Sequence, residues 1–495
     1  MAYSYPFNLI TEYVIKEHHV DVNEEYEIID IPARKLICPE RIDFMAKWIY
    51  IDSLEKGIDM TDATNMYVAH LDAFSLGTFV EPGKEWKNSV QIYLDTFNKL
   101  ISDIKIHGFD NKKSIIPVGG NGAILDGSHR VVVAAYYGYD VTIIRIPHAS
   151  VNFSAGWFRN NLLESKYLDW MISKYIEVTP KCYVACMWPV AIHKEKLKTS
   201  EDIISEYGDI IYKRDIELNK NGMKNFMSQI YGHQVWTGNF ENQYQGVDTK
   251  VKPCYKKGKP VHTVVFTANS LDEVLKLKEK IRNIYKLENH SIHITDSEEE
   301  ALQLAELLYN YNSVQHLKFG VPYKFVTVNR RIENFKKNIN ENGLELSRFI
   351  IDGESVLEIF GFCTSKKLTF LTDYREMNLP KIEKSDYYIS EVNDLIYNPN
   401  NYFIYKGIKF VALEKLLALE KNKKLNVKQR VYRLMNRCIR RTNKTRICEE
   451  NMLRNEREKK MYGKGLMKIE DYIFCVLKEN LKKKIRNVRM ILRVR

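Results

Sequence analysis

One stretch, residues 114–146, constrains the fold of this chain more than any other. SIIPVGGNGAILDG (114–127) has the pattern of a strand, a glycine-rich turn and a second short strand. HRVVVAAYYG (129–138) follows with helical spacing and ends at a glycine, and VTIIRI (141–146) alternates as a further strand. A strand that turns into a helix and returns as a strand is typical of a mixed α/β unit. The adjoining patterns predict a first strand and two helices in the same unit: 26–37, 40–56 and 89–107.

The turn before the predicted helix has the chemistry of an anion site. A helix that starts there presents free backbone N–H groups, and its dipole favours a negative charge. Gly127 lets a ligand approach the main chain closely, and His129 and Arg130 can add charge-assisted hydrogen bonds to the same anion. Asp126 could hold a metal ion that bridges phosphates. The alternative is a β-turn with an aspartate cap and a His–Arg pair on the surface.

The run ILDGSHRVVVAAYYG resembles the signature turn and helix of the ParB/sulfiredoxin superfamily. KLICPERID (35–43), after the first predicted strand, is similar to that family's first loop, and the resemblance covers roughly residues 26–147. The resemblance implies that the turn binds the phosphates of a nucleotide, ATP or another nucleoside phosphate, together with Mg²⁺. The implied phosphate-binding residues are consecutive: Gly127, Ser128, His129 and Arg130.

Differences within the signature favour the serine-kinase branch of that superfamily. Ser128 stands at the position where sulfiredoxin has its reactive cysteine. Partition proteins have Glu-Arg where this chain has Ser128-His129. The kinase resemblance implies catalytic roles for Asp126 and His129, a metal at Asp126, and Glu40 as the base that activates an acceptor hydroxyl. By itself, Glu40 is better explained as an acid near a helix N-terminus.

Other polar residues before the turn could line the same site. Three of them fall at helical spacing, and three lie in a loop-rich stretch that could close over an acceptor, although each is individually more typical of a solvated surface. The two sets are Arg41, Asp43 and Lys47, and His70, Glu81 and Lys84.

A second cluster of polar residues lies in HSIHITDSEEE (290–300). His290, His293 and Asp296 surround a predicted strand, and a metal or phosphate site could be drawn from them with Lys213 or Arg214. Helix capping at Ser297 plus partly buried strand histidines is the favoured explanation, because two histidines three apart on a strand face opposite ways.

Residues 350–373, with 397–428, resemble a nucleotidyltransferase-fold protein of surface-glycan gene clusters. Such enzymes need two acids one residue apart on a strand to hold Mg²⁺. The corresponding positions here are Lys367 and Thr369, and Asp373 alone cannot supply the pair. Asp352 and Glu354 precede the helix, so they do not restore the pattern. The resemblance therefore implies a unit that has lost its transfer chemistry.

The positive charge of the chain is concentrated at its C-terminal end. The whole chain of 495 residues has a net charge of +12, whereas residues 421–495 alone have 25 basic and 7 acidic side chains. A basic helical tail could bind an anionic membrane surface or nucleic acid, and the alternative is a solvated helical hairpin. Scattered cysteines and the lack of a long apolar run indicate a cytoplasmic protein, with the inner membrane surface as a place where the tail could bind.

These observations predict a multidomain protein of mixed α/β (α+β) class. Its leading predicted function is a nucleotide-dependent phosphotransferase acting on a small hydroxyl-bearing acceptor, with surface-glycan assembly as context. The alternative is a non-catalytic, ParB-like adaptor on DNA or membranes that uses the nucleotide as a switch. The predicted parts are a ParB/sulfiredoxin-like domain, a mixed middle domain, a degenerate nucleotidyltransferase-like domain and a basic tail: 1–150, 151–289, 290–420 and 421–495.

Overall fold

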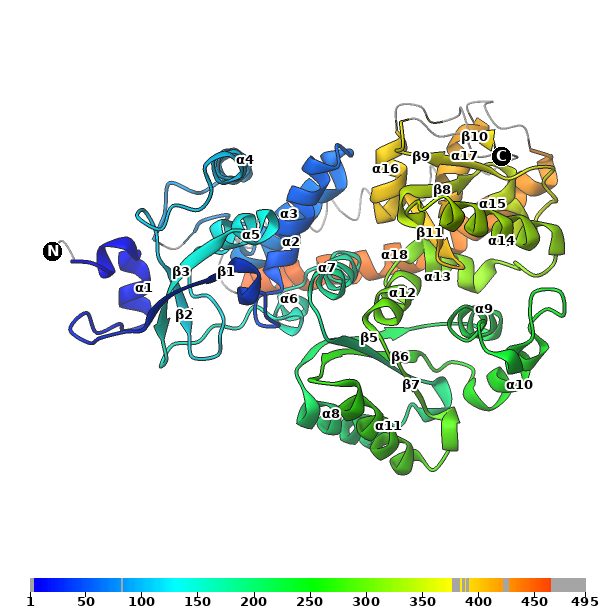
Figure 1. Ribbon diagram of the computed structural model, residues 1–495, viewed down its shortest axis with the longest axis horizontal. Helices are drawn as coiled ribbons and strands as arrows, with labels where there is room; N and C mark the ends of the chain where they lie inside the picture. The colour runs from blue at the N-terminus through cyan, green and yellow to red at the C-terminus, as the bar shows by residue number, and fades with distance from the viewer. Residues whose placement is uncertain are drawn as a thin grey trace.

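The stretch 114–146 forms the expected strand, turn, helix and strand in the computed structural model, which describes residues 4–81, 83–375, 383–384, 388, 391–421 and 427–463. The expected helix is α5 (Ser128–Tyr137), with Gly138 as its left-handed C-cap. The second short strand is reduced to one bridge between Val118 and Ile124. Three strands make the sheet in the order β1 (Ile28–Pro32), β3 (Asp140–Ile146) and β2 (Ile116–Gly119) (Figure 1).

Helices cover both faces of this first sheet, in which β3 is antiparallel to β1 and parallel to β2. Apolar side chains of α1 (Glu12–Glu17), including Val14, pack with Ile144 and Ile146 of β3 in a small separate core. On the other side, α5 packs against α2 and α4. The remaining helices of this unit are α2 (Asp43–Glu55), α3 (Met60–Ser75) and α4 (Val90–His107).

A second sheet is fully antiparallel and contains four strands. Their order is β5 (Ile210–Ile216), β6 (Val261–Thr267), β4 (Cys182–Met187) and β7 (Ile292–Ile294). Because β7 pairs with β4, the boundary expected at 289/290 falls inside this sheet. The helices between residues 151 and 290 are α6 (Ala155–Asn160), α7 (Ser165–Val178), α8 (Lys194–Tyr207), α9 (Lys220–Ile230), α10 (Gln245–Cys254) and α11 (Leu271–Tyr285).

A third, mixed sheet has the order β10 (Glu383–Lys384), β9 (Thr369–Thr372), β8 (Phe349–Asp352), β12 (Ile408–Val411) and β11 (Tyr402–Tyr405). β8 is parallel to β12 and antiparallel to β9. The helices after β7 are α12 (Glu298–Leu308), α13 (Tyr311–Phe319), α14 (Val326–Glu341), α15 (Glu354–Ile359), α16 (Val392–Tyr397) and α17 (Leu413–Lys421).

The described part of the basic tail is one long helix, α18 (Gln429–Gly463), which returns from the third sheet toward the first unit (Figure 1). Met435 is buried near its start. Near its end, Arg457 forms an ion pair with Asp72, and Lys460 donates to the carbonyl of Asn160. The described tail is therefore a helix packed on the body rather than a solvated hairpin. The basic run 481–495 lies outside the described residues.

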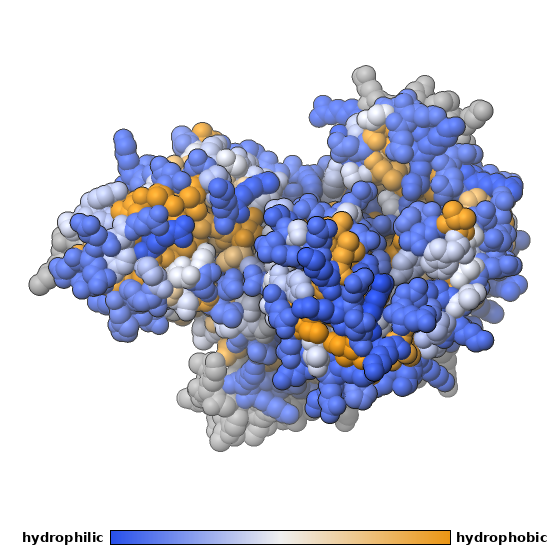
Figure 2. Space-filling model, turned by 60° about the horizontal axis from the view of Figure 1, so that its bottom comes forward, coloured by the Kyte–Doolittle hydropathy of each residue, from blue (hydrophilic) through white to orange (hydrophobic). Residues whose placement is uncertain are grey.

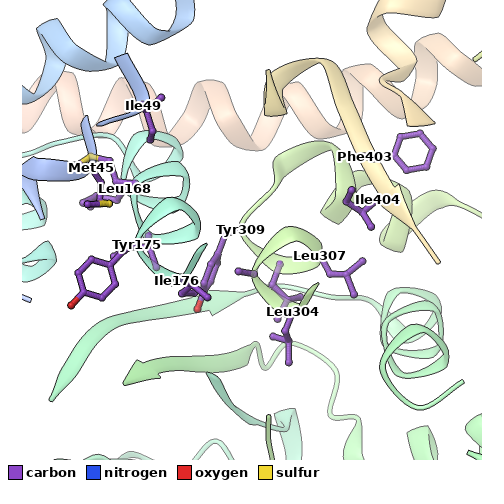
Figure 3. Packing of buried hydrophobic residues seen from close by; sticks show 14 of the residues in the cluster. Met45, Ile49, Leu168, Tyr175, Ile176, Leu304, Leu307, Tyr309, Phe403 and Ile404 are labelled. Carbon is purple, nitrogen blue, oxygen red and sulfur yellow. The ribbon is translucent and has the colours of Figure 1, made fainter. Parts of the chain in front are cut away.

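One continuous core joins the three sheets. Figure 3 follows it from Met45 on α2 through Tyr175 on α7 to Phe403 on β11. On the face drawn in Figure 2, hydrophilic residues dominate, and apolar residues gather on the N-terminal unit at the left. In the described parts of the chain no helix is long and apolar enough to cross a membrane, and the described cysteines are free thiols.

Candidate functional site

The backbone at residues 127–130 forms an open helix start, which we call the cradle. Gly127 has the left-handed φ of 88° that a non-glycine residue adopts only with strain. No side chain caps α5, and no described group accepts a hydrogen bond from the amides of Ser128, His129 or Arg130. These three amides and the helix dipole point in the same direction, so the cradle can bind an anion.

Asp126 lies directly beside the cradle and is held by several donors. Its Oδ1 accepts from the Gly127 amide at 2.7 Å, and its Oδ2 accepts from Thr11 Oγ1 at 3.3 Å. Lys84 Nζ and Arg130 Nη2 lie 4.0 and 3.8 Å from its oxygens. Burial alone would raise the pKa of Asp126, but these two positive charges lower it below its ordinary value. The carboxyl is therefore ionised at neutral pH.

The loop between α3 and α4 brings two lysines to the same place. Glu81 accepts from Lys84 at 2.7 Å and from Lys87 at 2.8 Å. Lys87 Nζ also lies 4.6 Å from the centre of the Tyr93 ring. One carboxylate thus holds two ammonium groups near Asp126, which leaves the surroundings of the cradle with a positive excess.

His129 is held by aromatic residues behind the cradle. Its Nε2 lies 2.9 Å from the Tyr67 hydroxyl, and its ring packs edge-to-face on Phe97. Burial, followed by the charges of Lys47 and Lys87, lowers the pKa of His129 well below its usual value. The imidazole is therefore neutral at pH 7.

A buried charged triad supports the cradle from below. Asp43 accepts from Arg41 at 2.8 and 2.9 Å and from Lys47 Nζ at 2.7 Å, and all three side chains are at most 5% exposed. Arg41 also donates to the Ile124 carbonyl. The surface interpretation of these three residues is therefore wrong, because all of them are buried. The triad also ties the start of α2 to Ile124, three residues before Gly127. His70, also expected at the surface, is completely buried.

The contacts of Glu40 are with residues outside the cradle. Its carboxylate interacts with the Cys38 thiol. Burial is the main cause of the raised pKa of the Tyr175 phenol, and the charge of Glu40 adds to it. Its carbonyl accepts from the Phe153 amide at 2.7 Å. Among the described residues, no ion pair or hydrogen bond joins Glu40 to the cradle.

The cradle is a poor site for a metal ion held by the protein. Among the described residues, Asp126 is the single carboxylate next to the helix start, and Lys84 and Arg130 already oppose its charge. No group of three or more His, Cys, Asp or Glu side chains suited to a metal occurs in the described part of the chain. The positive charge beside the helix start comes from the side chains of Lys84 and Arg130.

The other predicted sites are only partly assembled. Ser297 caps α12 as expected, and His293 is buried on β7. Lys213 pairs with Glu201 and Arg214 with Asp169, so neither joins the histidines. In the third unit Thr369 lies on β9 and Lys367 just before it, while Asp373 binds Arg348 and the Tyr397 hydroxyl, so no pair of acids forms on that strand.

No protein-family model matches this chain, and no curated protein or solved structure matches it either. The resemblance to the ParB/sulfiredoxin superfamily over roughly residues 26–147 therefore stays a prediction from the sequence. Three residues of the site were not foreseen from the sequence: Thr11, Tyr67 and Lys87. Of these three, only Lys87 could have been suspected from the sequence, because it follows Lys84 in the same loop at a spacing of three.

Proposed function

We propose that the first unit binds the phosphates of ATP or another nucleoside phosphate at the cradle and transfers a phosphoryl group to a small hydroxyl-bearing acceptor. The observation that carries this proposal is the open start of α5 facing Lys84 and Arg130. Free backbone amides with cationic side chains nearby suit phosphoryl transfer, because positioning and charge neutralisation supply most of its catalysis.

In the proposed reaction the acceptor hydroxyl attacks the terminal phosphorus, the bond to the bridging oxygen breaks, and the shorter nucleotide leaves. The proton of the hydroxyl passes to a carboxylate. Asp126 is the carboxylate that lies at the cradle, and Glu40 is the one that the kinase resemblance implies. Mg²⁺ enters with the nucleotide in this proposal, bound mainly by the phosphates.

The first test is thermal shift of the full chain with ATP, ADP, CTP and GTP in the presence of Mg²⁺. Binding to the folded state raises the apparent stability by mass action. Arg130→Ala and Lys84→Met should each remove most of the shift. Arg145→Ala, an exposed arginine of β3 paired with Glu27, is the matched control and should keep it. A full shift in both cradle variants would refute the site.

A second test separates the two carboxylates. Transfer of label from γ-labelled ATP to serine, glycerol and simple sugars would be compared for Asp126→Asn and Glu40→Gln. If Asp126 accepts the proton, its variant loses transfer and Glu40→Gln keeps it; the opposite result assigns the base to Glu40. If both variants keep label transfer, the proposed reaction is contradicted.

The competing adaptor function makes a different prediction. It requires DNA or vesicle binding that falls steeply with salt and depends on the tail. Removing residues 430–495 would strip buried Met435 from the core, so the informative truncation removes 464–495 only. Nucleotide binding and label transfer that survive this truncation favour the phosphotransferase.

A further inference from the structure

A hollow of about 760 Å³ lies in the middle unit, far along the chain from the cradle. Its walls come from α10, α11, β7 and the start of α12, and from the loop around Trp236. In Figure 1, α10, α11 and β7 lie in the lower right part of the molecule, and α12 lies above them. Its volume is in the range of sites for small molecules.

One wall of the hollow is positively charged. Lys250 Nζ donates to the Asn289 carbonyl at 2.6 Å and lies 3.3 Å from His290 Nδ1. Burial is the main cause of the lowered pKa of Lys250, and the nearby charge of Arg282 lowers it further. No described carboxylate forms an ion pair with Lys250 or Arg282, and the buried Arg282 Nε has no hydrogen-bond partner among the described residues. Two neighbouring cations without an acid favour an anion between them.

Three acids line the hollow, and two of them, Asp296 and Glu300, are engaged with other groups, whereas Glu299 is exposed at the start of α12. Asp296 accepts from Lys278 at 3.2 Å, and Glu300 lies 3.1 Å from His293 Nε2. Glu300 also accepts from the Asp296 amide at 2.7 Å. Burial would raise the pKa of Glu300, but its contact with His293 lowers it. Asp296 and Glu300 are therefore not free to neutralise the cationic wall, and they form a separate polar wall that suits hydroxyl groups.

Aromatic rings line the mouth of the hollow. The Tyr231 and Trp236 rings lie with their centres 5.7 Å apart, and Tyr231 packs edge-to-face on His293 at 5.3 Å. Trp236 is 45% exposed, which is unusual for a large aromatic ring without a role in packing. Such a surface suits the apolar face of a sugar or base.

We propose that this hollow is a second binding site, which takes an organic phosphate. The phosphate lies against Lys250, Arg282 and His290, the hydroxyl groups of the organic part face His293 and Glu300, and its ring packs on Trp236. The favoured sequence interpretation explains the burial of His293 on β7, whereas His290 is only half-buried in the turn before that strand. It does not explain the cations beside them, which form no ion pair with a described carboxylate. This site does not depend on nucleotide binding at the cradle.

Calorimetric titration of the full chain with pyrophosphate tests the cationic wall. The titration uses an Arg130→Ala background, so that binding at the cradle is removed. We expect binding to persist there, to weaken at least tenfold when Arg282→Gln or Lys250→Met is added, and to be unchanged by Lys280→Met. Lys280 is the matched control because it is exposed on the same helix and pairs with Glu206. Binding lost in Arg130→Ala alone, or equal in Arg282→Gln and Lys280→Met, would overturn the proposal.

The organic part is tested by comparing ribose 5-phosphate with inorganic phosphate. We expect the sugar phosphate to bind more tightly and Trp236→Ala to reduce that preference. Equal affinities in the starting protein would overturn the assignment of Trp236 and the polar wall. Far-ultraviolet circular dichroism of each variant shows that it is folded, and the two cationic variants test the same wall independently.

Discussion

At the scale of single residues, the sequence alone did not predict which charged side chains are buried. The spacing of Asp43 and Lys47 correctly placed them on one helix face, but charge by itself favoured the surface, whereas both are almost fully buried. A sequence does not show that Arg41, two residues before Asp43, folds back to complete the triad. The chemistry of Asp126 and Arg130 could be predicted because the glycine, the acid and the bases are adjacent in the chain.

The triad gives a prediction about stability. Asp43→Asn removes the carboxylate and leaves Arg41 and Lys47 buried without it, which should cost about 3–5 kcal/mol of unfolding free energy. The pKa of Asp43 is lowered because Arg41 and Lys47 outweigh the opposing effect of burial. The wild type should therefore lose this stabilisation as the pH falls below about 4. Denaturant unfolding measures both effects, with the exposed Asp103→Asn as control; a cost below about 1 kcal/mol would contradict the account.

His316 makes a pH-dependent prediction of its own. It is fully buried and stacks on Phe403 at 4.6 Å, and burial lowers its pKa to about 3. The unfolded chain therefore binds a proton below about pH 6.5 that the folded chain does not, so stability falls as the pH falls. Between pH 7 and 5 the loss from this residue should be about 2 kcal/mol. His316→Leu should lack it and the exposed His107→Leu should retain it; equal pH dependence in the two variants would disprove the assignment.

At the scale of elements, local patterns predicted most of the cradle. The helix after the Gly127 turn, its end at Gly138 and the strand that follows are all confirmed, because each depends on neighbouring residues. Pairing between distant segments was less predictable. β7 joins the second sheet through β4, more than a hundred residues earlier, and nothing in its three residues indicates that partner.

The turn itself can be tested with two glycines. A Cβ at Gly127 would lie 2.8 Å from Arg130 Nη2 and 3.0 Å from Ile116 Cδ1, whereas one at Gly122 would meet nothing within 4 Å. Both have positive φ, so Gly122→Ala should cost roughly 1–2 kcal/mol from backbone strain alone. Gly127→Ala should cost more and also weaken nucleotide binding, as measured by unfolding and by thermal shift. Equal effects of the two substitutions would show that the close packing at the cradle has no role.

At the scale of the whole molecule, α18 connects parts that are distant in sequence. The tail was predicted to be helical, and a helix is present over Gln429–Gly463. The sequence did not predict that Arg457 would contact Asp72 of the first unit or that Lys460 would contact the end of α6, because a charge run gives no information about where it binds. The described tail thus contributes to the body of the protein, in addition to any role in binding partners.

The packing of α18 predicts that substitutions at different positions of this helix change the unfolding free energy by different amounts. Met435 is completely buried and Met452 is 61% exposed. Met435→Ala should therefore lower the unfolding free energy by about 2–5 kcal/mol, and Met452→Ala should change it by less than about 0.5 kcal/mol. Denaturant unfolding of the full chain measures both. A small cost at Met435 would mean that α18 is not part of the common core.

The most direct test of the central claim is amide hydrogen exchange of the full chain with and without MgATP, or with whichever nucleotide gives the largest thermal shift. If phosphates bind the open start of α5, peptides that contain residues 127–131 should exchange more slowly when nucleotide is present, and this protection should disappear in Arg130→Ala. Protection that appears only elsewhere, for example in residues 231–300, with none at 127–131, would contradict the assignment of the nucleotide site to the cradle.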